Sequence, residues 1–329
     1  MRSRITRRDF ITSVSGAAAL GALSPLAFGD PRAQAAKAKV VVVSATDRKK
    51  GVAEVIRLLK VPPPRGKSVV IKPNFNTADP TPGSTHNDTL QQLIAELWER
   101  EARAITIGER SGPPATKKTM EDKGIFDLAR DLRVSVVNFE ELADADWVSV
   151  SPSGSHWSSG TFIPRLVAEA SYMVSTCCLK THGFGGVYSM SVKLAVGMTP
   201  KRLMREMHGS RDMRRMIAEI NAGYKPTFIV MDGLEAFVDG GPSQGKKVAA
   251  NVFVGGTDRV AVDAVGLAIL KELGSNAAIM ERKIFEQEQL QRAVELGLGV
   301  TGPDQIELVT GDAASKAYAD KIRARLALG

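Results

Sequence analysis

Short apolar runs alternate with amphipathic helical stretches along the chain from residue 40 onward. Runs rich in β-branched residues are typical of buried strands, and apolar residues spaced three and four apart are typical of helices. The expected strands are 40–44, 68–71, 104–107, 134–139, 147–150, 172–178, 227–231, 250–256 and 305–309. The expected helices are 51–60, 88–100, 117–131 and 258–273, with further helical stretches before 221, near 277–296 and after 309.

This order of elements restricts the fold class. Strands that alternate with helices usually lie parallel in one sheet, because each helix carries the chain back to the same edge. We therefore expect an α/β fold: layered, with a mostly parallel or mixed sheet and helices on both faces. Since no Pro/Gly/Ser linker long enough to separate domains interrupts the pattern, residues 36–329 are predicted to form a single α/β domain.

Residues 1–35 are predicted to be a twin-arginine export signal rather than part of the fold. Arg7 and Arg8 precede a small-residue, moderately apolar stretch, and Ala33 and Ala35 provide a small-x-small cleavage site. A membrane anchor is the alternative, but glycines and a proline interrupt the apolar run. We expect export by the twin-arginine machinery, a periplasmic or otherwise exported location, and no stable membrane span after cleavage.

Composition excludes some classes of partner and cofactor. Residues 1–35 contain five Arg and two Asp, so the formal net charge falls from +8 for the whole chain to +5 without them. The basic residues are scattered and aromatics make up only 5%, so we expect no nucleic-acid binding. The only cysteines, Cys177 and Cys178, are adjacent and are expected to be buried free thiols. Two cysteines are too few for an intrinsic iron-sulfur cluster, so none is expected, and the identity of any other metal or cofactor stays open.

Polar residues follow four of the predicted strands. Lys72 and Asn74 follow the second, Glu109 the third, Lys180 and His182 the strand at 172–178, and Asp232 the strand at 227–231. In open α/β sheets, ligands bind beyond the carboxyl ends of the strands. If these strands are parallel, their polar groups share one rim that can bind an anion and move a proton.

The residue types suggest separate roles. Lys72 and Lys180 are expected to hold an anion, His182 or His208 to act as acid or base, and Asp232 to orient a partner or ligate a metal. We assign Lys180, His182, His208 and Asp232 to catalysis, and the predicted substrate-binding residues are Lys72, Asn74, Lys193, Gly185, Gly186, Gly241 and Gly245.

Each of these assignments has a structural alternative. The glycines of GFGG (183–186) and DGGPSQG (239–245) can present backbone amides to an anion, or can simply form turns. His208 is equally well explained as a cation at a helix end. Lys193 and Asp263, in otherwise apolar surroundings, belong either to structural ion pairs or to a site.

Five separated motifs resemble a known family. IKPNF (71–75), LKTH (179–182), SVKLAVGMTPKRLMREMHG (191–209), IVMDGLEAFVDGGPSQG (229–245) and GGTDRVAVDAVG (255–266) are similar, in the expected order, to landmarks of the domain of unknown function 362 family, here in a twin-arginine-exported form.

The family assigns no activity. Its members often carry an added ferredoxin-like domain, for which this chain has no cysteines. The family also looks distantly similar to the nickel-pincer lactate racemases, a fold-level analogy that transfers no catalytic residue.

Two functions remain open at this point. The first is an enzyme acting on a small anionic substrate at a Lys/His/Asp site, with or without help from a metal or cofactor. The second is a non-catalytic periplasmic protein that binds a ligand or assists a redox partner at the same rim.

Overall fold

A computed structural model describes residues 37–329, so the predicted export signal and its cleavage site lie outside the described residues. The strands of the main sheet are β1 (Ala38–Ser44), β2 (Ser68–Lys72), β3 (Ala104–Glu109), β4 (Ser135–Asn138), β7 (Met173–His182), β8 (Val187–Tyr188), β9 (Phe228–Gly240), β10 (Gly245–Gly256) and β11 (Ile306–Val309). A separate two-stranded sheet consists of β5 (Trp147–Val150) and β6 (Thr161–Pro164).

The helices connect these strands as the sequence pattern indicated. They are α1 (Arg48–Leu59), α2 (Asn87–Glu99), α3 (Thr116–Asp122), α4 (Ile125–Asp131), α5 (Arg165–Ala168), α6 (Met204–Gly209), α7 (Met213–Ile220), α8 (Arg259–Glu272), α9 (Ala277–Met280), α10 (Glu288–Glu295) and α11 (Ala313–Leu328). Among the short 3-10 helices, η3 (Lys193–Met198) and η4 (Lys201–Leu203) matter for the site.

The main sheet is mixed but mostly parallel: along its main path, within residues 37–329, only β10 runs against the other strands. Its strand order is β11-β1-β10-β9-β7-β2-β3-β4, with β8 paired to β7. The run β9-β7-β2-β3-β4 is entirely parallel, whereas β10 lies antiparallel to both β9 and β1. The predicted α/β class is therefore confirmed. The four strands that carry the predicted polar site residues, β2, β3, β7 and β9, run in the same direction.

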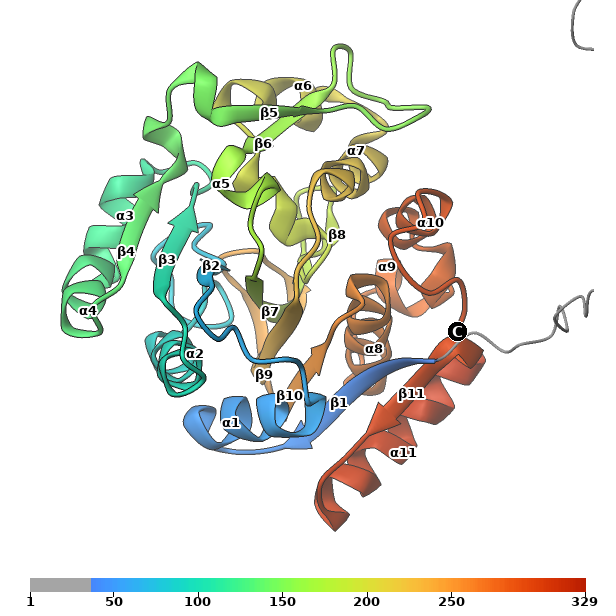
Figure 1. The fold of residues 1–329 in the computed structure, drawn as a ribbon. Helices are drawn as coiled ribbons and strands as arrows, with labels where there is room; N and C mark the ends of the chain where they lie inside the picture. The colour runs from blue at the N-terminus through green and yellow to red at the C-terminus, as the bar shows by residue number, and fades with distance from the viewer. Residues whose placement is uncertain (1–36) are drawn as a thin grey trace, which may run out of the picture. The chain divides into compact units, whose positions relative to one another are not determined.

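Helices cover both faces of the sheet (Figure 1). One core lies between the sheet and helices α1, α2, α3 and α4, and the other lies under α7, α8, α10 and α11. Helix α8 is buried along nearly its whole length, from Arg259 to Lys271. Each buried Leu or Ile side chain stabilises the fold by about 1.5–3 kcal/mol, so this helix fixes the second layer. Asp258 begins it by accepting hydrogen bonds from the amides of Val260 and Ala261.

Several predicted elements have different bounds in the structure, and three of them are informative. The expected helix at 117–131 is two helices, because Gly124 adopts a left-handed conformation (φ 65°) between α3 and α4. The strand expected at 172–178 continues as β7 through Lys180 to His182, and all ten of its residues are buried. The strand expected at 227–231 continues to Gly240, because its pairing with β10 extends past Asp232.

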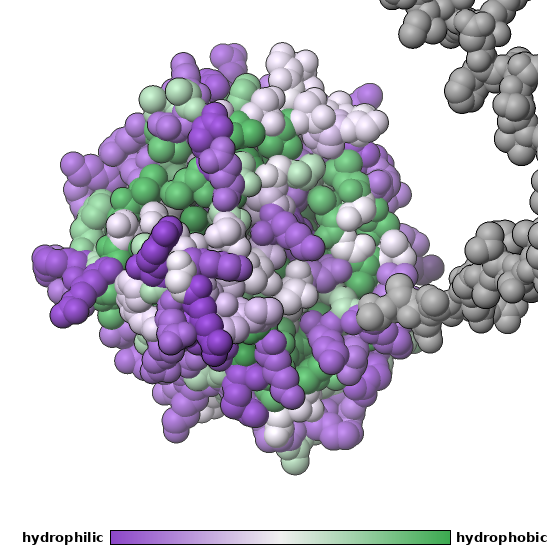
Figure 2. All heavy atoms as spheres, viewed as in Figure 1, coloured by the Kyte–Doolittle hydropathy of each residue, from purple (hydrophilic) through white to green (hydrophobic). Residues whose placement is uncertain are grey.

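Within residues 37–329, no helix combines the length and the apolar character needed to cross a membrane. On the face drawn in Figure 2, hydrophilic side chains are spread widely, with hydrophobic ones between them.

Candidate active site

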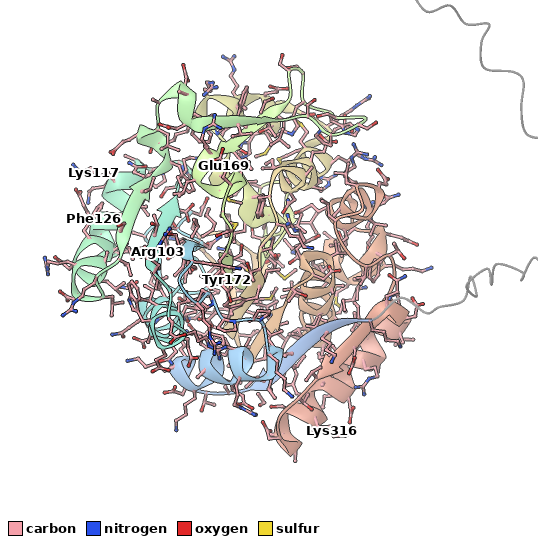
Figure 3. All side chains as sticks on the ribbon, viewed as in Figure 1. Arg103, Lys117, Phe126, Glu169, Tyr172 and Lys316 are labelled. Carbon is pink, nitrogen blue, oxygen red and sulfur yellow. The ribbon has the colours of Figure 1, made fainter. Side chains whose placement is uncertain are left out.

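A cavity of about 440 Å³ opens at the carboxyl ends of the parallel strands. Lys72 ends β2, Glu109 ends β3, and His182 ends β7. In Figure 3, Arg103 and Tyr172 mark the amino ends of β3 and β7, so the cavity lies at the opposite end of the same strands. Its lining residues are Lys72, Asn74, Phe75, Asn76, Glu109, Arg110, Gly112, Pro113, Lys180, His182, Phe184, Ser189, Lys193, Leu194, Val196, Gly197, Lys201, Met204, His208, Pro242 and Ser243.

Lys72 and Glu109 form a buried ion pair on the wall made by the sheet. The Lys72 ammonium contacts Glu109 Oε1 and donates a 2.6 Å hydrogen bond to the Pro73 carbonyl. Glu109 also accepts hydrogen bonds from the amides of Phe75 (2.7 Å) and Arg110 (2.8 Å). Burial lowers the pKa of Lys72 and raises the pKa of Glu109. The charge of Glu109 opposes the first shift, and the charge of Lys72 opposes the second.

Lys180 is fully buried and is surrounded by oxygen atoms of the protein. Its Nζ donates to Asn74 Oδ1 (3.1 Å), the Gly83 carbonyl (2.6 Å) and the Pro242 carbonyl (3.0 Å). An ammonium group has three N–H donors, so the protein satisfies all of them. Burial lowers the pKa of Lys180, since no carboxylate contacts it among residues 37–329.

Arg110 anchors the opposite wall to the sheet. Its guanidinium donates to the carbonyls of Thr199 (2.9 Å), Ser111 (2.8 Å) and Val196, and its amide donates to the Gly197 carbonyl (3.1 Å). Two of these acceptors belong to η3. Burial lowers the pKa of Arg110 to about 10, which leaves it charged at neutral pH.

Lys193 differs from the other buried lysines of the cavity. Its side chain is only 9% exposed, yet within residues 37–329 no acceptor or carboxylate contacts its ammonium. A β-carbon placed on Gly186 would lie 2.7 Å from Lys193 Cε and 3.0 Å from His182 Nδ1, so these two side chains lie against the same glycine. His182 Nδ1 is itself buried and without a hydrogen-bond partner in the described part of the chain.

Burial and neighbouring positive charges lower the pKa of both Lys193 and His182. Desolvation, together with the charges of Lys180 and Arg110, lowers the pKa of Lys193 to about 7. Desolvation and the charges of Lys193, Lys180 and His208 lower the pKa of His182 to about 2. Near neutral pH, therefore, about half of the Lys193 side chains are free amines beside a neutral imidazole.

Asp263 positions the backbone that carries Lys193. Its fully buried carboxylate accepts hydrogen bonds from the amides of Ser191 (2.7 Å) and Val192 (2.9 Å), immediately before η3. Burial raises the pKa of Asp263 to about 7, and the two amides oppose this shift. η3 is thus anchored before its first residue by Asp263 and at its last turn by Arg110. The ion-pair alternative considered for Asp263 is not what the structure shows, because amides of the backbone are its partners.

Asp232 does not line the cavity. Because β9 continues past this residue, Asp232 lies within a strand rather than at its end, and its side chain points to the face covered by α1 and α2. There its carboxylate accepts from Arg48 Nε (3.1 Å), Thr89 Oγ1 (2.7 Å) and the Leu234 amide (3.1 Å). The prediction that this carboxylate lies beside the lysines is therefore wrong. Asp232 instead connects α1 and α2 to the sheet.

The four predicted glycines lie beside the cavity rather than in its wall. Gly185 and Gly186 belong to the β7–β8 turn, where their carbonyls accept from Arg214 and Gln289. Gly241 and Gly245 form the β9–β10 turn, which places Pro242 and Ser243 in the cavity. A β-carbon on Gly241 would overlap the Thr181 carbonyl, so the close approach of this turn requires a glycine.

The remaining predicted residues line the cavity together. Lys72, Asn74, Lys180, His182, Lys193 and His208 all do so, from four separate stretches of chain. His208 lies at the exposed mouth, where its Nδ1 bonds the Met204 carbonyl at 2.8 Å. Lys201, also at the mouth, pairs with Glu140 at 2.8 Å.

The sequence reasoning did not assign a role to Glu109, Arg110 or Lys201. Glu109 and Arg110 had been visible as a charged pair after the apolar run 104–107, and that signal, treated like Lys72, would have identified them. Lys201 carried no distinguishing signal.

A second hollow, of about 1040 Å³, lies at the amino ends of the strands. Its two most buried charged residues have structural partners: Asp258 caps α8 and accepts from the Val300 amide (2.8 Å), and Arg259 donates to the carbonyls of Asn221 and Tyr224. The smaller cavity is therefore the better candidate for chemistry.

The cavity offers two imidazoles, His182 and His208, as nitrogen ligands. Among residues 37–329, no three His, Cys, Asp or Glu side chains are grouped closely enough to hold a metal ion. Cys177 and Cys178 are buried free thiols, as predicted.

A family profile described as "Domain of unknown function (DUF362)" matches residues 69–268. The chain belongs to the DUF362 family. Those residues carry every cavity-lining lysine and histidine of this DUF362 protein, from Lys72 to His208. No curated protein matches the chain.

Two solved structures are similar to this DUF362 protein. One is a lactate racemase apoprotein from Thermoanaerobacterium thermosaccharolyticum, with 14% identity, a TM-score of 0.43, and coverage of 87% of this chain and 86% of that one. The other is a protein from Thermotoga maritima, with 13% identity, a TM-score of 0.42, and coverage of 76% of this chain and 58% of that one.

Proposed function

We propose that this DUF362 protein is an enzyme that binds a small anionic substrate in the cavity and moves a proton to or from it with Lys193 and His182. One observation carries the proposal. Lys193 and His182 line the cavity and are each only 9% exposed, and among residues 37–329 neither the amine nor the imidazole has a hydrogen-bond or ion-pair partner. Unpaired buried polar groups cost stability, so their presence together in a cavity indicates a ligand or a reaction.

The charges of the cavity favour an anion. Among residues 37–329, Glu109 is the one carboxylate that lines the cavity. Five basic side chains line it: Lys72, Arg110, Lys180, Lys193 and Lys201. Lys72 has two protein acceptors for three N–H donors, which leaves one donor for a ligand. A volume of about 440 Å³ suits a small metabolite.

The pKa values support proton transfer. A base with a pKa near the working pH transfers protons most efficiently, and Lys193, at about 7, meets this condition. A bound anion offsets the surrounding positive charge and raises the pKa of both Lys193 and His182, so binding itself makes the pair more basic.

Hydrogen exchange tests the proposal without knowledge of the natural product. A panel of small carboxylates, including hydroxy, oxo and amino acids, is incubated with the protein in deuterium oxide, and loss of C–H signals is followed by NMR. At least one compound should exchange its hydrogen, and Lys193→Met and His182→Gln should each abolish that exchange. Lys118→Met, at an exposed residue paired with Asp122, is the control and should exchange normally. Compounds that bind without any exchange would favour the non-catalytic binding protein.

We also propose that residues 1–35 direct export of the folded protein by the twin-arginine machinery. The support is the sequence alone: Arg7 and Arg8, the small-residue stretch, and Ala33 and Ala35 before the cleavage site. Residues 1–40 fused to a reporter that folds in the cytoplasm should bring it to the periplasm. Replacing Arg7 and Arg8 by lysine should stop export, and an unchanged distribution would contradict the proposal.

A further inference from the structure

We propose that Lys193 forms an imine with the carbonyl carbon of a 2-oxo acid, so that the anionic substrate is a small carboxylate with an adjacent ketone or aldehyde. This inference rests on the proposed function, because it uses the same cavity. It adds a covalent step and a substrate class.

Contacts distinguish Lys193 from the other lysines as the nucleophile. Lys180 donates to three oxygen atoms of the protein, and Lys72 is paired with Glu109 and with a carbonyl. Oxygen atoms of the protein therefore hold both of these nitrogen atoms in place. Lys193 has no such partner in the described residues, and its pKa of about 7 leaves a substantial share of free amine at neutral pH. Only the unprotonated amine has the lone pair that attacks a carbonyl.

The arrangement around Lys193 suits a carbonyl beside a carboxylate. Lys180 and Arg110 are close enough to lower its pKa by their charge, and the same positive field attracts a carboxylate. Leu194, Val196 and Met204 line the cavity with apolar surface, which excludes water from the carbonyl carbon. His182 lies on the same side of the cavity as Lys193, since both side chains lie against Gly186.

The covalent step balances without a further reactant. The Nζ lone pair attacks the carbonyl carbon while the C=O π electrons move to oxygen, which gives a carbinolamine once a proton has moved from nitrogen to oxygen. The carbinolamine loses that oxygen with its hydrogen and a second nitrogen-bound hydrogen as one water molecule, and a C=N bond forms. A protonated imine withdraws electrons from the neighbouring carbon, which makes its hydrogen easier to remove.

Borohydride trapping tests the step directly. The protein is incubated with pyruvate and sodium cyanoborohydride at pH 7, digested, and analysed by mass spectrometry for the reduced adduct on each lysine peptide. Lys193 should be labelled at least about tenfold faster than exposed lysines such as Lys118, because its pKa of about 7 leaves free amine at neutral pH and the cavity holds the carboxylate beside it. Acetone, which lacks the carboxylate, should label Lys193 much more slowly than pyruvate does. Lys193→Arg, which keeps a charge but has no attacking amine, should give no adduct in that peptide.

The outcomes separate this inference from the proposed function. If pyruvate labels Lys193 no faster than Lys118, the imine is overturned. If hydrogen exchange nonetheless occurs and is lost in Lys193→Met, Lys193 is a proton carrier only and the proposed function stands. If there is neither labelling nor exchange with any carboxylate, both proposals fail. Selective labelling of Lys193 by pyruvate supports the imine, and its loss when acetate is added in excess shows that the carboxylate site is shared.

Discussion

The two walls of the cavity differ in the hydrogen-bond and ion-pair partners that they give to buried lysines. On the wall built by the sheet, Lys72 and Lys180 reach a carboxylate and several carbonyl oxygens supplied by the protein. On the wall built by η3 and the β7–β8 turn, Lys193 and His182 have no such partners within residues 37–329. The first wall uses its charges to hold the strand ends together. On the second wall, the amine of Lys193 and the imidazole of His182 are available to a ligand, and leaving them without partners costs stability.

The largest expected effect is on the sheet wall. Lys72→Met leaves the buried Glu109 carboxylate without its counter-ion, and breaking a buried pair in this way costs about 3–5 kcal/mol. Chemical denaturation at pH 7 should show this loss, and the matched double variant Lys72→Met with Glu109→Gln should recover part of it. A loss of less than about 1 kcal/mol for the single variant would show that the ion pair contributes little to stability, and would contradict the difference between the two walls.

The same substitution on the η3 wall should have the opposite sign. Lys193→Met removes a buried cation without a partner among residues 37–329, and the lowering of its pKa from 10.5 to about 7 corresponds to a gain of roughly 3–5 kcal/mol at pH 6. Between pH 7 and 10.5 the folded protein binds fewer protons than the unfolded chain at this residue, so the stability of the wild type rises with pH. The advantage of the variant should therefore shrink across that window, while its activity stays absent. Thermal denaturation from pH 6 to pH 10 measures both, and a variant less stable than the wild type at pH 6 contradicts the comparison.

A smaller effect is expected where η3 begins. Asp263→Asn retains one oxygen acceptor for the two amides of Ser191 and Val192, so one buried hydrogen bond is lost at about 1–3 kcal/mol. Because these amides precede Lys193, the variant should also weaken hydrogen exchange on the best carboxylate of the panel. Denaturation and exchange rates are compared with those of Asp320→Asn, at an exposed residue of α11. Equal behaviour of the two variants would show that Asp263 does not position this wall.

The smallest effect is a change in bound protons. Because the pKa of Lys193 is about 7 and a bound anion raises it, binding of acetate, which cannot form the imine, should take up a fraction of a proton at pH 7. Calorimetric titration in two buffers with different ionisation enthalpies gives this number. The uptake should vanish in Lys193→Met and persist in Lys118→Met, and an equal uptake in both would assign the proton to another group.

The sequence pattern predicted the part of the site that depends on local order. Alternating elements implied parallel strands, and Lys72, Lys180 and His182 follow or end such strands, so their convergence was predictable. Asp232 was misplaced because the length of β9 is set by its pairing with β10, a partner far along the chain. Where a strand ends decides whether a side chain lies on a rim or inside a layer.

The contrast between the two walls was not predictable from sequence. Lys180 and Lys193 have similar apolar neighbours in the chain, and only tertiary packing gives one of them Gly83 and Pro242 as acceptors. Glu109 became recognisable as the partner of Lys72 only when β2 and β3 were seen to be paired. Hydrogen-bond partners that are distant in sequence leave no local pattern to read.

The most direct test of the account is the titration of Lys193 itself. In protein labelled with ¹³C at the lysine Cε positions, the Lys193 signal, assigned by its absence from Lys193→Arg, is followed by NMR from pH 5 to pH 11. We expect a midpoint near 7, well below the ordinary value of 10.5, which moves upward when acetate, a carboxylate that cannot form the imine, is bound. A midpoint at the ordinary lysine value, unchanged by the anion, would show that Lys193 is a solvated surface cation and would contradict the account.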